Sequence, residues 1–166
     1  LKSSTFIQEN CPENLSLKQE LIKELEGIVS DKTIIASSTS SFLPTELQKA
    51  CAHAERVIVG HPMNPPHLIP VVEIVLGKVS NQEIANRAKS FYSSLQRVAI
   101  QIKKEMRGHL ANRLTSALYR EAVYLVSEGV ADVEDVDSVI SNGPGLRLAL
   151  FGPHMNYHLG LSLIHI

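Results

Sequence analysis

The sequence contains few aromatic residues and few cysteines. Aromatic side chains make up 5% of its 166 residues, tryptophan does not occur, and the two cysteines are Cys11 and Cys51. Two cysteines cannot form a disulfide framework, and neither has the spacing of a zinc ligand. These absences exclude a disulfide-rich secreted domain. We therefore expect a reducing compartment, the cytoplasm, and no bound metal.

Net charge and long apolar runs are also lacking. The formal net charge is −1 at pH 7, so the sequence offers no basic surface for nucleic acid or for an anionic membrane. No apolar run reaches the ~18 residues of a membrane-spanning helix. We expect neither nucleic acid nor a membrane as a partner. A hydrophobic content of 44% and a charged content of 20% are ordinary for a globular protein.

Strand and helix patterns alternate from the start of the sequence to about residue 103. Short apolar runs indicate the strands, and amphipathic or proline-led segments between them indicate the helices. This alternation predicts an α/β sheet. The expected strands are 5–7, 33–36, 57–59, 70–75 and 98–102, and the expected helices are 16–28, 44–50 and 83–95.

The start and the exposed side of the first helix can be predicted from its residues. Ser16 and Gln19 have the spacing of a capping box, which places the helix start at Ser16. Leu21 and Leu25 belong to an apolar stripe that we expect to face the sheet. Lys18 is then available for the solvent-exposed side, as an ordinary solvated residue.

From residue 105 onward the pattern is only helical. A stripe of apolar residues predicts one long helix over 109–127, which Gly129 is placed to stop. Asp132 is a candidate N-cap for a second helix over 133–141. We therefore expect two domains, an α/β part over 1–104 and an all-helical part over 105–160.

The stretch that begins at Gly60 carries the most chemical information. It places His61 at the end of an apolar strand, and two prolines that favour a turn follow. Glu73 comes twelve positions after His61, inside the next apolar run. A chain that turns at Pro65 and Pro66 and runs back brings the carboxylate beside the imidazole. Such a pair suits general acid–base catalysis near neutral pH.

Each residue of this pair also has an ordinary structural interpretation. A lone histidine at a strand end is more often structural than catalytic. Glu73 has the alternative of facing water at a strand edge, which its neighbours Val72 and Ile74 disfavour. The sequence supports no role for the other histidines, which include His53, His67, His109, His154 and His158.

Two further polar residues are placed to bind a substrate. Ser40 lies in a Ser/Thr run, 37–41, after a buried strand, and open α/β sheets bind ligands at the carboxyl ends of their strands. Asn112 lies in the second turn of the predicted long helix, after Gly108, which permits close approach of the backbone. The alternatives are a turn-forming run for Ser40 and an exposed helix position for Asn112.

These residues together resemble the 3-hydroxyacyl-CoA dehydrogenase family, over about residues 5–160. Within the family the sequence is most similar to the branch of L-carnitine dehydrogenase and L-gulonate 3-dehydrogenase, which includes lambda-crystallin. The stretches that carry the resemblance are 37–41, 60–73, 108–114, 132–137, 143–147 and 152–153.

The resemblance implies the C-terminal part of a Rossmann-like dinucleotide-binding domain followed by part of an all-helical domain. It implies NAD as the cofactor and oxidation of a 3-hydroxyl group, with L-carnitine preferred. A short-chain 3-hydroxyacyl-CoA is the alternative substrate, and L-gulonate is third. A non-catalytic, crystallin-like protein is the alternative of another class. Family members usually dimerise, so a homodimer is expected for the full-length protein.

The resemblance also implies roles for individual residues. His61 matches the family's general base, and Glu73 matches the residue that orients it. Ser40 and Asn112 match residues that position the substrate. The family commonly has proline at the position of Arg107. The residues that match cofactor-contacting positions are Glu13, Lys18 and Ser38.

The glycine-rich loop of the family has no counterpart in this sequence. That Gly-x-Gly-x-x-Gly loop binds the dinucleotide phosphates, whereas Gly143 and Gly145 lie in a helical context. The sequence also starts at Leu1 rather than at methionine. We therefore expect a piece of a longer protein, truncated at both ends and inactive alone. Residues 161–166 resemble a translated sequencing adapter, so a foreign tail is an alternative there.

Overall fold

The computed structural model describes the backbone of residues 1–164 and the side chains of residues 1–160. It forms two compact units, one from Leu1 to Leu114 and one that begins at Thr115. The segment 161–166, for which a foreign tail is the alternative, lies outside the residues whose side chains are described. Within the described part, no helix is both long and apolar enough to cross a membrane.

The first unit is built on a five-stranded sheet with the order β1-β2-β3-β4-β5. The strands β1, β2 and β3 are parallel, β4 runs antiparallel to β3, and β5 is parallel to β4. β2 is buried along its whole length, as a continuous apolar run predicts. The predicted Rossmann-like α/β fold is confirmed. The strands are β1 (Phe6–Glu9), β2 (Ile34–Ser37), β3 (Val57–Pro62), β4 (Val71–Val75) and β5 (Val98–Ile102).

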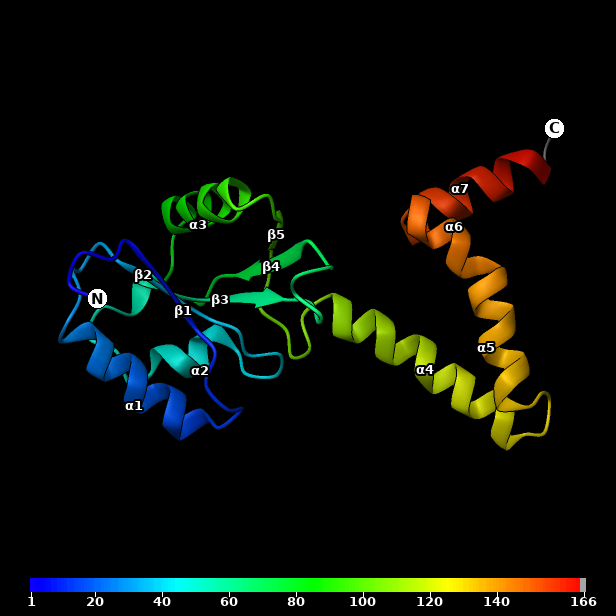
Figure 1. The fold of residues 1–166 in the computed structure, drawn as a ribbon, viewed down its shortest axis with the longest axis horizontal. Coiled ribbons are helices and arrows are strands. Elements are labelled where there is room, and N and C mark those ends of the chain that lie inside the picture. The colour runs from blue at the N-terminus through cyan, green and yellow to red at the C-terminus, as the bar shows by residue number, and fades with distance from the viewer. Residues whose placement is uncertain (165–166) are drawn as a thin grey trace. The chain divides into compact units, whose positions relative to one another are not determined.

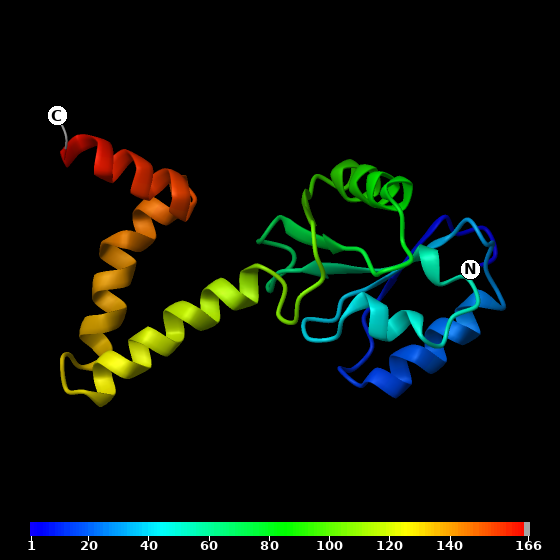
Figure 2. The same ribbon diagram turned by 180° about the vertical axis from the view of Figure 1, so that it is seen from behind.

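Helices cover both faces of the sheet (Figures 1 and 2). α1 (Leu15–Glu26) and α2 (Pro44–Gln48) lie on one face, and α3 (Gln82–Ser94) lies on the other. Because alternate residues of a strand point to opposite faces, two apolar cores form. The core at α1 and α2 includes Ile22, Leu47 and Val59, and the core at α3 includes Ile58, Ile74, Ala88 and Tyr92.

The start of α1 differs from the capping-box prediction. Asn14 is the N-cap, because its side-chain oxygen accepts a hydrogen bond from the N–H of Leu17 at 3.1 Å. Asparagine is at least as good an N-cap as serine. The hydroxyl of Ser16 instead donates a hydrogen bond to the side chain of Asn14 at 2.8 Å. The helix therefore begins before the serine that the sequence pattern indicated.

The second unit is all-helical, as predicted for this part of the sequence. Gly129, with φ of 67°, follows the end of the long helix α4. None of the described residues of α4, α5 and α6 is buried, and many of their large apolar side chains, such as Leu118 and Val139, are exposed. The helices are α4 (Ala111–Ser127), which begins in the first unit, α5 (Val133–Asn142), α6 (Pro144–Leu150) and α7 (Pro153–Ile164).

Candidate active site

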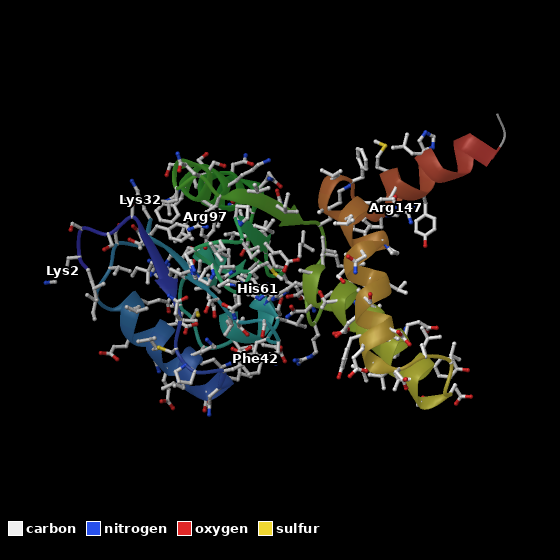
Figure 3. All side chains as sticks on the ribbon, turned by 45° about the vertical axis from the view of Figure 1, so that its right-hand side comes forward. Lys2, Lys32, Phe42, His61, Arg97 and Arg147 are labelled. Atoms are coloured by element: carbon white, nitrogen blue, oxygen red, sulfur yellow. The ribbon has the colours of Figure 1, made fainter. Side chains whose placement is uncertain are left out.

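His61 and Glu73 face each other across β3 and β4. They are direct partners in the antiparallel register, because the chain reverses between the two strands. Nδ1 of His61 lies 2.8 Å from Oε2 of Glu73, and the two side chains are 8% and 3% exposed. Figure 3 shows His61 within the first unit. This burial excludes the alternative of a water-facing glutamate at a strand edge.

The second carboxylate oxygen of Glu73 holds the start of α4. Its Oε1 accepts hydrogen bonds from the N–H groups of Leu110 and Ala111, both at 2.9 Å. Such N–H groups have no partner inside the helix, so the carboxylate satisfies donors that would otherwise be unpaired. Burial raises the pKa of Glu73, but hydrogen bonds from His61, Ala111 and Leu110 and the charge of His61 lower it more. The net pKa lies below its ordinary value, and Glu73 is a carboxylate at neutral pH.

The ionised carboxylate fixes which nitrogen of His61 carries the proton. A carboxylate only accepts hydrogen bonds, so the Nδ1–H of His61 is the donor in this contact. The neutral ring then has its lone pair at Nε2, which makes no hydrogen bond to a described residue. An imidazole with a free lone pair and a buried carboxylate behind it is the arrangement of a general base.

Gly60, directly before His61, lies too close to its neighbours to carry a side chain. A Cβ at this position would lie 1.9 Å from the hydroxyl oxygen of Tyr92 and 3.2 Å from Cβ of Ala36. The Gly60 carbonyl accepts a hydrogen bond from the side-chain amide of Gln8 at 3.0 Å, and Gln8 also accepts one from the Tyr92 hydroxyl. The backbone before His61 is therefore fixed from the side of the sheet that α3 covers.

Two residues with left-handed backbone conformation precede α4. Gly108 and His109 have φ of 77° and 49°, outside the right-handed helical region. For this reason α4 begins at Ala111 rather than at the predicted His109. Asn112 is half-buried and lies in the first turn, next to the residue whose N–H binds Glu73. Glu73 thus holds the helix end that carries Asn112.

The Ser/Thr run after β2 is organised by one carboxylate, that of Glu13. Its Oε1 accepts hydrogen bonds from the N–H groups of Ser40 (3.2 Å) and Ser41 (3.1 Å) and from the hydroxyls of Thr39 and Ser41. Burial raises the pKa of Glu13, but the hydrogen bonds from Ser41 and Thr39 and the charge of Lys18 outweigh it, and the net pKa is lowered. The conformation around Ser40 therefore depends on Glu13 as an anion.

Lys18 is not on the solvent-exposed side of α1, so this prediction is wrong. Its side chain is fully buried, and Nζ lies 2.9 and 3.0 Å from the two oxygens of Glu9 and 2.9 Å from the carbonyl oxygen of Cys11. Oε2 of Glu13 is 3.6 Å away. The N–H of Ser38 donates to the Glu9 carbonyl at 2.9 Å. Two of the three residues expected at the cofactor, Lys18 and Glu13, therefore meet beyond the end of β1, and Ser38 is bonded to the last residue of that strand.

His109 belongs to the site, although the sequence pattern gave it no role. Its side chain is fully buried, and its ring centroid lies 5.1 Å from that of His61. Nε2 donates a hydrogen bond to the carbonyl of Thr39 at 3.0 Å. Only its place after Gly108, near a predicted helix start, distinguished it from the other histidines in the sequence.

Arg107 ties the segment before α4 to the Ser/Thr run. Its guanidinium donates a hydrogen bond to the carbonyl of Ser41 at 3.3 Å and binds the carboxylate of Glu46. Glu105 adds a second link, because it accepts hydrogen bonds from the N–H and hydroxyl of Thr45 at 3.1 and 2.7 Å. A proline at position 107 could make neither the hydrogen bond to Ser41 nor the ion pair with Glu46.

The polar groups beyond β1 and β2 fit a dinucleotide better than a metal ion. Among the described residues, no three His, Cys, Asp or Glu side chains are grouped to hold a metal. The side chain of Glu13 is 39% exposed, and Ser38 is half-buried, so both can reach a bound molecule. The ammonium of Lys18 is enclosed by acceptors of the protein, which fits a supporting role.

A parallel-dominated sheet covered on both faces, with polar groups gathered beyond its strand ends, is the architecture of dinucleotide-binding proteins. Comparison with known proteins identifies the family. The chain belongs to the 3-hydroxyacyl-CoA dehydrogenase family: the family's NAD binding domain matches residues 1–106, and its C-terminal domain matches residues 108–164. The resemblance found in the sequence is confirmed.

Three relatives illustrate the likeness. L-carnitine dehydrogenase of Oceanobacillus iheyensis is 47% identical over 159 residues, which cover 96% of this chain and 52% of that protein. A solved 5-formyl-3-hydroxy-2-methylpyridine 4-carboxylic acid 5-dehydrogenase, an NAD+-dependent dismutase, has a TM-score of 0.92 at 34% identity, covering 99% of this chain and 53% of its own. The 3-hydroxyacyl-CoA dehydrogenase of Archaeoglobus fulgidus has a TM-score of 0.85 at 30% identity, covering 93% and 53%. The chain spans about half the length of these relatives.

Proposed function

We propose that this protein is an NAD-dependent dehydrogenase that oxidises the 3-hydroxyl group of L-carnitine. The observation that carries the proposal is the buried His61–Glu73 pair, found in a chain 47% identical to an L-carnitine dehydrogenase. Oxidation of a secondary alcohol removes a proton from its oxygen and a hydride from its carbon. NAD+, when bound, is the hydride acceptor.

The protein's own residues handle the proton and the substrate oxygen. His61 takes the hydroxyl proton at Nε2, the nitrogen that carries the lone pair when Nδ1–H is bonded to Glu73. Glu73 then stabilises the imidazolium at a distance of 2.8 Å. Ser40 and Asn112 position the substrate. The support for these two roles is that Glu13 and Glu73 hold the segments on which they lie.

The cofactor side of the site is proposed at the ends of β1 and β2. Glu13 and Ser38 are placed to contact NAD there, because both have exposed surface. Lys18 acts at the same place through Glu13 and Glu9, since its own ammonium is buried between acceptors. Glu13 and Ser38 would thus touch the cofactor, and Lys18 would hold the surrounding carboxylates in place.

A short-chain 3-hydroxyacyl-CoA is the second candidate substrate, and L-gulonate is the third. The match to the family and the likeness to the Archaeoglobus fulgidus 3-hydroxyacyl-CoA dehydrogenase favour the CoA thioester. A non-catalytic, crystallin-like role is the alternative of another class. The complete His61–Glu73 pair disfavours this alternative, because a buried imidazole–carboxylate pair is the arrangement that proton abstraction needs.

We further propose a homodimer and a cytoplasmic location for the whole protein. The support for the homodimer is the exposed apolar surface of α4 and α5, with Leu118 47% and Val139 63% exposed, since such surfaces mark interfaces. The support for the cytoplasm is that Cys11 and Cys51 are both free thiols.

The test compares three substrates of the full-length protein. NADH formation is measured with L-carnitine, 3-hydroxybutyryl-CoA and L-gulonate, and the highest kcat/KM is expected for L-carnitine. His61→Gln should lower kcat by about 10²–10⁴-fold and leave NADH binding unchanged. His67→Gln, at an exposed histidine, is the matched control. A folded protein that oxidises none of the three would refute the proposal and favour the non-catalytic alternative.

A further inference from the structure

His109 is a buried polar residue that the proposed mechanism does not use, and it lies beside the proposed base. It has 0% exposure and lies two residues before α4 with φ of 49°. A left-handed backbone is unfavourable for any residue that carries a Cβ, and glycine would adopt it more easily. Histidine is enriched among the non-glycine residues that adopt positive φ, but the conformation alone does not require it, because glycine adopts it more easily.

The hydrogen bonds of the His109 ring are satisfied at only one of its two nitrogens. Nε2 must be the donor to Thr39, because a carbonyl oxygen only accepts, so the neutral ring has its lone pair at Nδ1. Within the part of the chain that the structure describes, this Nδ1 is buried and has no hydrogen-bond partner. A buried acceptor without a partner destabilises the folded state; an apolar ring of similar size would avoid this cost but would also take the donor away from the Thr39 carbonyl.

What His109 does touch are two working parts of the site. Its ring lies against that of His61, with centroids 5.1 Å apart and planes inclined by 51°. Its Nε2–H holds the carbonyl of Thr39 at 3.0 Å, and the next residue is Ser40. In addition, the N–H groups of the two residues after His109 bind Glu73. One side chain therefore spans the distance between the base and the segment that carries Ser40.

We propose that His109 is a positioning residue that sets the spacing between the imidazole of His61 and the Ser40 segment. The inference deepens the proposed function and rests on it for the roles of His61 and Ser40. The Nε2–H of His109 anchors the segment through Thr39, and the ring face limits the rotation of His61. A phenylalanine keeps the ring but removes the donor. A glutamine keeps an N–H donor near the position of Nε2 but removes the ring.

The first arm of the test measures the segment itself and needs no activity. Amide hydrogen exchange of Ser40 and Ser41 is followed by NMR in the 166-residue chain, since both amides are bonded to Glu13. His109→Phe should speed their exchange several-fold, up to about tenfold, the effect of losing one hydrogen bond. His109→Gln should restore most of the protection. His67→Phe, at an exposed histidine, should exchange like the unchanged chain.

The second arm measures turnover of the full-length protein. His109→Phe should lower kcat by about 10- to 100-fold through misplacement of the reacting groups, with NADH binding unchanged. His109→Gln should recover part of the loss. Unchanged exchange in His109→Phe, or exchange in His109→Gln as fast as in His109→Phe, would overturn the inference. If His109→Phe does not fold, the His109→Gln variant decides. Exchange of the Ser40 and Ser41 amides more than tenfold faster than in the unchanged chain would overturn the inference. Amides that stay protected in His109→Gln would support it. If the unchanged protein has no activity, the proposed function fails, while the exchange data still decide the role of His109.

Discussion

Replacing Glu73 by glutamine should separate the stability of the site from its chemistry. Glu73 accepts three hydrogen bonds, from Nδ1–H of His61 and from the N–H groups of Leu110 and Ala111. A glutamine can keep the two backbone bonds with its oxygen, but its NH2 group then faces His61. That contact survives only if His61 adopts the other tautomer, with a lone pair at Nδ1 and the proton at Nε2. The base nitrogen is then blocked.

The magnitudes follow from these three contacts. A hydrogen bond to a charged acceptor contributes about 1.5–3 kcal/mol and a neutral one about 0.5–1.5 kcal/mol. Glu73→Gln weakens three such bonds but also removes the unfavourable burial of a charge. We therefore expect a loss of about 1–3 kcal/mol in the free energy of unfolding at neutral pH. For turnover we expect a loss of about 10⁴-fold, the size of the effect that the wrong tautomer has in a Ser–His–Asp triad.

The pH dependence gives an independent check on the same carboxylate. Its folded-state pKa is lowered below the ordinary 4.5, so its contribution to stability is present above that value and is lost as the pH falls through the folded pKa. In urea unfolding of the 166-residue chain, the free energy of unfolding should be higher for the unchanged chain than for Glu73→Gln, and this difference should narrow below pH 4.5. Glu83→Gln, at an exposed position in α3, is the control.

Two results would refute this reasoning. One is a proton that remains on Nδ1 of His61 in Glu73→Gln, read from the ring nitrogen chemical shifts by NMR. The other is a stability gap between the two chains that stays constant from pH 7 to pH 3. Either result would mean that the ionised carboxylate does not determine the state of the imidazole.

Three further substitutions probe the framework of the site. Gly60→Ala places a Cβ 1.9 Å from the hydroxyl of Tyr92, so it should lower stability by about 1–3 kcal/mol in thermal unfolding; an unchanged Tm would contradict the close contact. Lys18→Met leaves the carboxylate of Glu9 buried without its cation, and a loss of about 3–5 kcal/mol is expected in urea unfolding; a loss below about 1 kcal/mol would show that the pair is not coupled. Glu13→Gln should lower the free energy of unfolding at pH 7, and the difference from the unchanged chain should disappear once the pH falls through the lowered pKa of Glu13. A difference that stays the same at every pH would show that the charge of Glu13 does not stabilise the chain.

The pairing of His61 with Glu73 could be predicted because it is a local consequence of the sequence. Two strands joined by a proline-containing turn place residues opposite one another in a fixed register, and side chains alternate between faces with a period of two. His61 and Glu73 are separated by twelve positions, and the turn brings them into direct register. The chemistry then follows from the two residue types.

The remaining partners of the site could not be predicted, because they join distant parts of the chain. Glu73 binds the N–H of Leu110 across 37 positions, and His109 binds Thr39 across 70. No local periodicity encodes such contacts. Lys18 shows the same limit on a helix, because its position in the helical pattern indicates a wet face, whereas a buried glutamate at the end of β1 makes that position an interior one.

Glu73 is the residue that joins the two halves of the proposed chemistry. One oxygen orients the base on β3, and the other holds the first turn of α4, where Asn112 lies. Removal of its charge therefore changes the tautomer of the proton acceptor, and it weakens without breaking the two bonds that hold the helix end carrying Asn112. His109 touches the base and the Ser40 segment without contacting the carboxylate through its ring, so its substitution should disturb spacing and leave the tautomer of His61 unchanged. The two variants divide the site into a protonation component set by Glu73 and a distance component set by His109.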